Sequence, residues 1–247
     1  GLGNVWKFPY ITGQYGGGAF VLIYFMFLLI LGIPALTAEL AVGRASQRSV
    51  AMSMDMLERK GQKWHLFKYP AMAGNYLLMM FYTTVAGWML YYFFKMAAGG
   101  FAGMTPDEVG AAFNNTLGSP SINIGFMVIV VLVGMVVVGM GLQNGVEKIT
   151  KVMMLALLIL MVVLAVRSIF LPGGEAGLKF YLTPNLDAIK EHGLSTVLFA
   201  AMSQAFFTLS IGMGSMAIFG SYIDRSRRLC GEAISITVLD TSVALMA

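Results

Sequence analysis

The chain opens with Gly1-Leu2-Gly3-Asn4, continues with Val5-Trp6-Lys7-Phe8-Pro9, and reaches Gly16-Gly17-Gly18-Ala19-Phe20 a few residues later. Glycine and asparagine crowded at the start of an apolar segment indicate backbone that leaves the regular helical path. Inside a bilayer such backbone persists only around a cavity, because lipid cannot satisfy the freed polar groups. If the rest of the chain spans a membrane, this stretch predicts a transporter.

The composition is that of a membrane protein. Hydrophobic residues make up 58% of the 247 residues and charged residues 11%, whereas about 25% charged residues is usual for soluble domains. The mean hydropathy is +0.78. Residues 109–146 and 193–223 carry no charge and exceed the roughly 20 residues that a membrane helix needs. We expect an all-α polytopic protein with one transmembrane domain over residues 1–247.

The charge-free runs predict seven membrane segments. We place them up to about residue 13, near residues 19–42, 69–94, 123–141, 152–166 and 195–222, and from about residue 229. Most of the sixteen basic residues lie in the connection 44–68 and in the connections after the fourth and sixth helices. By the positive-inside rule these connections are cytoplasmic, and the loops 98–121 and 167–193 are extracellular. The net charge of +4 therefore calls for no nucleic-acid partner.

The first residue already lies inside a motif and the last inside an apolar run, so we expect the chain to be part of a longer protein. The sixth segment contains a second candidate interruption, Phe-Thr-Leu-Ser-Ile-Gly-Met-Gly-Ser at residues 207–215. Close packing of helices through small residues is the alternative explanation. The matching break at the start of the chain favours a binding site, since two interrupted helices in corresponding positions are typical of inverted-repeat carriers.

Two acids, Glu39 and Asp240, lie within predicted spans, where an acid is retained when it has a partner. Asp240 could join Asn4 and Thr208 in an oxygen shell for a hard cation. Alternatively, it is an acid near a helix end that reaches water. Glu39 lies near Arg44, so a salt bridge or a backbone-bracing role is as reasonable as a ligand contact.

Catalysis has little support in the sequence. His65 and His192 fall in loops, no Cys/His cluster exists, and no nucleophile–base pair can be assembled. We expect a protein that is not an enzyme.

Four motifs together resemble those of the neurotransmitter:sodium symporters, the LeuT-like carriers of amino acids. They are Gly-Leu-Gly-Asn-x-Trp-Lys-Phe-Pro-Tyr (1–10), Gly-Gly-Gly-Ala-Phe (16–20), Gln-Ala-Phe-Phe-Thr-Leu-Ser-Ile-Gly-Met-Gly (204–214) and Gly-Ser-Tyr (220–222). The resemblance covers essentially the whole chain. It implies a five-plus-five inverted repeat with discontinuous helices one and six, of which this chain would hold the first seven helices, without the inner half of helix one.

The resemblance also implies an amino acid as substrate. Backbone N–H groups of Leu2 and Gly3 would hold its carboxylate together with the Tyr82 hydroxyl, as helix N-termini hold anions. Gly1 occupies the position where monoamine carriers have Asp, and glycine there argues for a substrate with its own carboxylate. The implied substrate residues are Gly1, Leu2, Gly3, Leu78, Tyr82, Phe207, Thr208, Ser210 and Met213.

The same resemblance implies Na⁺ as the coupling ion, bound by Asn4, Thr208 and Asp240. Tyr24, Gln204 and Asp240 match the surroundings of chloride in chloride-dependent relatives. Those relatives have Asn at the position that Asp240 occupies in this chain. A built-in carboxylate would supply the negative charge that chloride otherwise brings, so we expect chloride-independent uptake.

The gate residues implied by the resemblance are Lys7, Gln204 and Tyr222. Lys7 stands where the family most often has Arg, and lysine lacks the planar fork that binds a carboxylate with two parallel hydrogen bonds. Leu155 follows Gly145 at the spacing where many members carry a helix-five proline, so we expect a stiffer inner half of that helix.

Together these features predict a sodium-coupled importer of a neutral, hydrophobic amino acid that works by alternating access. Its partners would be that amino acid, sodium ions and the lipid bilayer of a bacterial-type plasma (inner) membrane. Two alternatives stay open: a proton-coupled permease with Asp240 or Glu39 as proton carrier, and a membrane protein that binds an amino acid without transporting it.

Overall fold

The computed structural model describes residues 2–247, except for the side chains of residues 142–144. Regular structure in this part is helical, apart from one isolated antiparallel bridge between Gly17 and Pro184. The chain forms two compact units, and each is described by itself. The first unit holds Gly1–Ala73 with Ala156–Ala247, and the second holds Gly74–Leu155.

Within residues 2–247, five helical stretches are long and apolar enough to cross a membrane. They are Gly18–Ser46, Trp64–Ala97, Pro120–Gly139, Gly145–Ile169 and Leu229–Met246. These stretches match five of the seven segments expected from the sequence. The two remaining segments are the shorter pieces at the start of the chain and on either side of the predicted break in helix six. The fold is therefore that of a multi-pass helical membrane protein.

The first segment consists of a π-helix, η1 (Gly3–Lys7), that continues into α1 (Phe8–Gln14). Pro9 occupies the first turn of α1 and has no N–H to donate to the preceding turn, which favours the wider winding of η1. Leu2 also has helical dihedral angles. The irregularity expected around residues 1–4 is thus a widened helical turn from Gly3 on, and Gly1 lies outside the described residues.

The second helix is continuous but changes its winding midway. It comprises α2 (Gly18–Phe27), the π-helix η2 (Leu28–Gly32) and α3 (Ile33–Ser46), with Pro34 in the first turn of α3. Three elements then lead out of the first unit: α4 (Val50–Leu57), the 3₁₀ helix η3 (Trp64–Phe67) and α5 (Lys68–Ala97).

The second half of the first unit is built from six helices. They are α8 (Lys148–Ile169), whose first eight residues belong to the second unit, α9 (Gly174–Leu182), α10 (Leu186–His192), α11 (Leu194–Leu209), α12 (Met216–Tyr222) and α13 (Leu229–Met246). Helix six is interrupted between α11 and α12, as the sequence predicts. Ser210, Gly212 and Gly214 have φ of +53°, +98° and +68°, a region that L-residues other than glycine rarely adopt.

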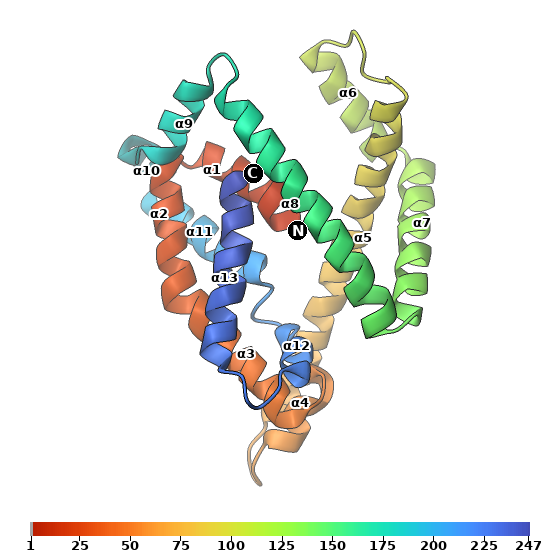
Figure 1. The fold of residues 1–247 in the computed structure, drawn as a ribbon, viewed down its shortest axis with the longest axis vertical. Helices are drawn as coiled ribbons and strands as arrows, with labels where there is room; N and C mark the ends of the chain where they lie inside the picture. Colours follow the sequence, from red (N-terminus) through yellow and green to blue (C-terminus); the bar gives the residue numbers. More distant parts are fainter. Residues whose placement is uncertain (1) are drawn as a thin grey trace. The chain divides into compact units, whose positions relative to one another are not determined.

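The core of the first unit forms where α11 packs against α2, while α12 and α13 pack against α3 (Figure 1). Its largest fully buried side chains come from the first, second and sixth helices. They are Phe8, Phe20, Tyr24, Leu28, Leu36, Leu40, Val197 and Gln204.

Two glycines allow α3 and α12 to cross closely. A methyl group on Gly43 would lie 1.9 Å from the carbonyl oxygen of Ala217, and one on Gly220 would lie 2.4 Å from that of Leu40. Because both obstacles are backbone atoms, no side-chain rearrangement could make room. Small residues at such crossings are how membrane helices gain close packing.

We predict that Gly43→Ala lowers the free energy of unfolding by about 1 to 3 kcal/mol, because the added methyl group must push α3 and α12 apart. Thermal unfolding of the full-length protein in detergent measures the change. Gly134→Ala on α7 is the matched control, since a methyl group there meets nothing within 4 Å. Equal melting temperatures for the two variants would contradict the close crossing.

The glycine motif at residues 16–18 anchors the long loop that follows α8. A methyl group on Gly17 would lie 2.3 Å from the Phe180 carbonyl oxygen, and one on Gly16 would lie 2.7 Å from the Ala188 side chain. Both glycines also have positive φ, +94° for Gly16 and +60° for Gly17. The motif therefore has a packing role that requires partners some 165 residues away in the sequence.

The second unit contains most of α5, then α6 (Pro106–Leu117), α7 (Pro120–Gly139), the π-helix η4 (Leu142–Glu147) and the start of α8. Thr105 and Glu108 form a reciprocal capping box that starts α6. The hydrogen bonds from the backbone and side chain of Thr105 lower the pKa of Glu108. The Trp88 indole donates to the Asn123 side chain at 2.9 Å and fixes α5 against α7.

Candidate functional site

A polar cluster joins three elements that are far apart in the sequence: η1, α11 and α13. The Asn4 amide nitrogen donates to the Asp240 carboxylate at 2.8 Å and to the Asp240 carbonyl at 2.9 Å. The Thr208 hydroxyl lies 2.7 Å from the other carboxylate oxygen and also contacts the Asn4 side-chain oxygen. The structure thus brings together the three residues that the sequence analysis assigns to a sodium site.

The donor set of this cluster suits a hard cation. An amide oxygen, a hydroxyl and a carboxylate are oxygen ligands of the kind that hard cations prefer. Groups of three or more His, Cys, Asp or Glu side chains that could hold a metal are absent from the described part of the chain. Hence the cluster resembles neither a zinc site nor a polynuclear acidic site. Its single carboxylate balances one positive charge.

Next to this cluster, η1 lies directly against α11. The Gln204 amide donates to the Gly3 carbonyl at 3.1 Å, and a methyl group on Gly3 would lie 3.0 Å from the Phe207 ring. The Lys7 ammonium sits 4.2 Å from the centre of that same ring, which is within the range of cation–π attraction. Gly3 and Phe207, two residues assigned to the substrate site by the sequence, are therefore neighbours, and their role in binding stays a prediction.

The remaining predicted residues are spread more widely. Ser210 lies in the break of helix six, where its carbonyl accepts a hydrogen bond from the Ser215 hydroxyl at 2.6 Å, and Met213 lies in the same break. Leu78 and Tyr82 are one helical turn apart on α5 in the second unit. Their position at the substrate site stays a prediction, as does that of Gly1.

The predicted gate residues fall on two sides of the break in helix six. Lys7 on η1 and Gln204 on α11 lie beside Gly3 and Phe207. Tyr222 ends α12, beyond the break, and its side chain is 68% exposed. Tyr222 thus lies apart from Lys7 and Gln204, and the gate role of all three residues stays a prediction.

Glu39 on α3 binds the backbone exposed by the break in helix six. Its carboxylate accepts hydrogen bonds from the backbone N–H groups of Gly212 at 2.6 Å, Gly214 at 3.2 Å and Met216 at 3.2 Å. Arg44 donates instead to the Arg227 carbonyl. Of the roles left open by the sequence, the structure shows backbone bracing: the carboxylate satisfies amides that the break releases from the helical ladder.

We predict that Glu39→Gln destabilises the protein by about 1 to 3 kcal/mol, because the amide keeps one acceptor oxygen and turns a donor toward backbone N–H groups. Thermal unfolding of the full-length protein in detergent checks this expectation. Glu191→Gln, an exposed site on α10, removes the same charge and should leave stability unchanged. A Glu39→Gln melting temperature equal to that of the control variant would refute the bracing role.

Buried polar atoms without partners surround the cluster on the α2 side. The hydroxyls of Tyr24 and Thr241 and the side-chain oxygen of Gln204 have no hydrogen-bond partner among the described residues, although all three residues are at most 5% exposed. Thr208, Thr241 and Asp240 lie close enough to the Tyr24 hydroxyl to act on it electrostatically. The structure therefore places Tyr24 near Asp240, and their role around an anion stays a prediction. The sequence analysis did not single out Thr241, which only the fold places beside Tyr24.

The fold and this cluster define a multi-pass membrane protein with an interrupted helix beside a partly buried polar site. The profile of the Sodium:neurotransmitter symporter family matches residues 1–103 and 111–247. The chain belongs to this family.

Among solved structures, that of MhsT in complex with L-phenylalanine superimposes with a TM-score of 0.89 at 35% sequence identity and covers the whole chain. The uncharacterized sodium-dependent transporter YhdH of Bacillus subtilis is 34% identical over the whole chain. The sodium-dependent neutral amino acid transporter SLC6A17 of Rattus norvegicus is 28% identical over the whole chain. The chain spans 54% of YhdH, 37% of SLC6A17 and 55% of MhsT. The LeuT-like fold expected from the motifs is thereby confirmed.

Proposed function

We propose that the protein is a sodium-coupled symporter that imports a neutral, hydrophobic amino acid by alternating access. The observation that carries this proposal is the convergence of Asn4, Thr208 and Asp240 from three helices. Their oxygens would bind Na⁺ directly beside the residues assigned to the substrate. The protein would lie in the plasma (inner) membrane with the connection 44–68 in the cytoplasm.

The substrate carboxylate would bind at the start of η1. The family resemblance assigns the backbone N–H groups of Leu2 and Gly3 to this carboxylate, and the start of a helix is a favourable site for an anion. Phe207 beside Gly3 supplies an apolar wall, and the MhsT structure was solved with L-phenylalanine. This arrangement supports a hydrophobic amino acid as substrate.

Coupling would follow from the proximity of the ion and substrate sites. Asn4 directly follows Gly3, so one turn of η1 serves both ligands. One charge crossing about 100 mV releases about 2.3 kcal/mol, and a tenfold sodium gradient adds about 1.4 kcal/mol. One sodium ion would therefore support accumulation of about 500-fold.

The decisive experiment is uptake of labelled phenylalanine and leucine into proteoliposomes that contain the full-length protein. We expect accumulation that requires an inward sodium gradient at fixed pH. Uptake driven by a pH gradient without sodium would favour the proton-coupled alternative, and binding without accumulation would favour a non-transporting protein. Either result would overturn the proposal.

We predict that replacing chloride by gluconate leaves uptake unchanged, because the Asp240 carboxylate supplies the fixed negative charge near Tyr24. Asp240→Asn should lower sodium-driven uptake at least about tenfold in gluconate, and chloride should restore part of it. Initial uptake rates in the two salts measure both effects. Loss of wild-type uptake in gluconate would contradict the role assigned to Asp240.

We predict that Leu155→Pro speeds amino acid exchange. The α8 helix runs from Lys148 to Ile169 without interruption, and proline at residue 155 would remove one backbone hydrogen bond from its inner half. Exchange of labelled amino acid across proteoliposomes, normalised to protein that binds substrate, gives the rate. Leu158→Pro, almost one turn further along, is the positional control; equal rates for wild type and Leu155→Pro would refute the inference.

A further inference from the structure

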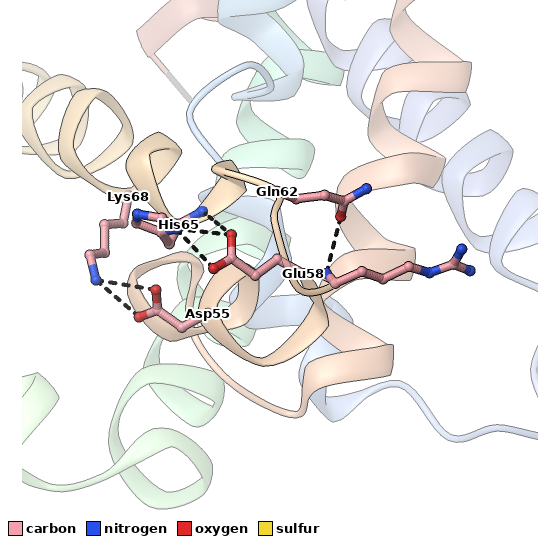
Figure 2. Close-up of polar contacts among 6 residues, drawn as sticks. Asp55, Glu58, Gln62, His65 and Lys68 are labelled. Atoms are coloured by element: carbon pink, nitrogen blue, oxygen red, sulfur yellow. Dashed lines mark hydrogen bonds and ion pairs between the residues drawn. The ribbon is translucent and has the colours of Figure 1, made fainter.

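The connection between α4 and α5 is a turn that hydrogen bonds and an ion pair stabilise (Figure 2). The Glu58 carboxylate accepts a hydrogen bond from the His65 backbone N–H at 2.9 Å and lies 2.8 Å from the His65 ring. Asp55 pairs with Lys68 at 3.0 Å. At the end of the turn, the Arg59 N–H donates to the Gln62 side chain at 3.1 Å.

Both acids of the connection take part in these contacts, and three basic residues near its turn have no acidic partner among the described residues. Asp55 and Glu58 are the only acids in residues 44–68, and the N–H of His65 is the main cause that lowers the pKa of Glu58. Arg59, Lys60 and Lys63 are exposed, and none of them has an ion pair within residues 2–247. Three positive charges therefore face outward without a counter-charge.

Apolar side chains flank these charges where the chain enters the membrane. Trp64 is 59% exposed, Leu66 48% and Leu57 42%, and Trp64 begins the candidate span Trp64–Ala97. Tryptophan at the end of a span favours the headgroup level of the bilayer. We call the set of Leu57, Arg59, Lys60, Lys63, Trp64 and Leu66 the tip surface.

We propose that the tip surface binds the headgroups of anionic phospholipids in the adjacent leaflet. Its unpaired cations match the charge of lipid phosphates, and basic clusters immediately next to a membrane helix attract such lipids. The exposed apolar side chains distinguish this surface from a site for free phosphate, because they can enter the bilayer beside the bound headgroup. The proposal does not depend on which solute the protein carries.

The test uses the full-length protein in liposomes and fluorescence quenching by brominated lipids. The Trp64 contribution is the difference in quenching between the wild type and Trp64→Phe. We expect brominated phosphatidylglycerol to quench Trp64 at least about fivefold more effectively than brominated phosphatidylcholine, the gain from about one basic contact. The preference should fall in 0.5 M salt, which screens exposed charges.

The charge-removal variant Arg59→Gln/Lys60→Gln/Lys63→Gln should lose this preference. The variant Arg167→Gln/Lys179→Gln/Lys190→Gln removes three charges from the opposite set of loops and should keep it. Equal quenching by the two lipids, or no quenching of Trp64 by either, would overturn the proposal on the wild type alone, even if the charge-removal variant failed to fold. Because the readout is lipid contact and not uptake, the result is independent of the proposed transport.

Discussion

The first unit depends on one constraint: a helix that stops inside a bilayer must find other partners for its backbone. Between Leu209 and Met216 the helical ladder is broken, and the Glu39 carboxylate receives three of the released N–H groups. These hydrogen bonds give the Glu39 carboxylate partners in place of water. The requirement also explains the close crossing of α3 and α12, since Glu39 reaches the break only if the two helices approach to the distance that Gly43 and Gly220 permit.

In the polar cluster, side chains act as hydrogen-bond partners for one another in the same way. Asn4, Thr208 and Asp240 satisfy one another while they hold η1, α11 and α13 together. Each of them offers an oxygen that a hard cation can bind. A cation there would therefore act on three helices at once, and through Asn4 on the turn of η1 that carries the amides of Leu2 and Gly3. Under the proposed function, coupling between ion and substrate would need no long pathway, because neighbouring residues of one turn would contact both.

Much of this architecture could be predicted from the sequence, and the exceptions have physical causes. Membrane spans follow from charge-free length, and the break in helix six follows from glycine and serine in the middle of an apolar run. The function of Glu39 could not be decided, because an acid five residues before Arg44 gives the same pattern whether it pairs with arginine or braces backbone. The packing of Gly17 against Phe180 depends on a contact between distant segments, and such contacts leave no periodic pattern. The π-helical winding of η1 was not predicted, although Pro9 in the first turn of α1 favours it.

The two halves of helix six are attached to different parts of the second helix. α11 packs on α2 and is tied to η1 through Gln204 and Thr208, whereas α12 packs on α3 and is tied to it through Glu39. Because α2 and α3 belong to one continuous helix, α12 can move relative to α11 only if that helix bends or one of these attachments breaks. The π-helical turn at Leu28–Gly32 lies opposite the break, where a methyl group on Gly32 would come within 2.9 Å of Leu209. Since π-helical turns are local irregularities that often mark functional sites, we expect the second helix to bend at this turn if α12 moves relative to α11.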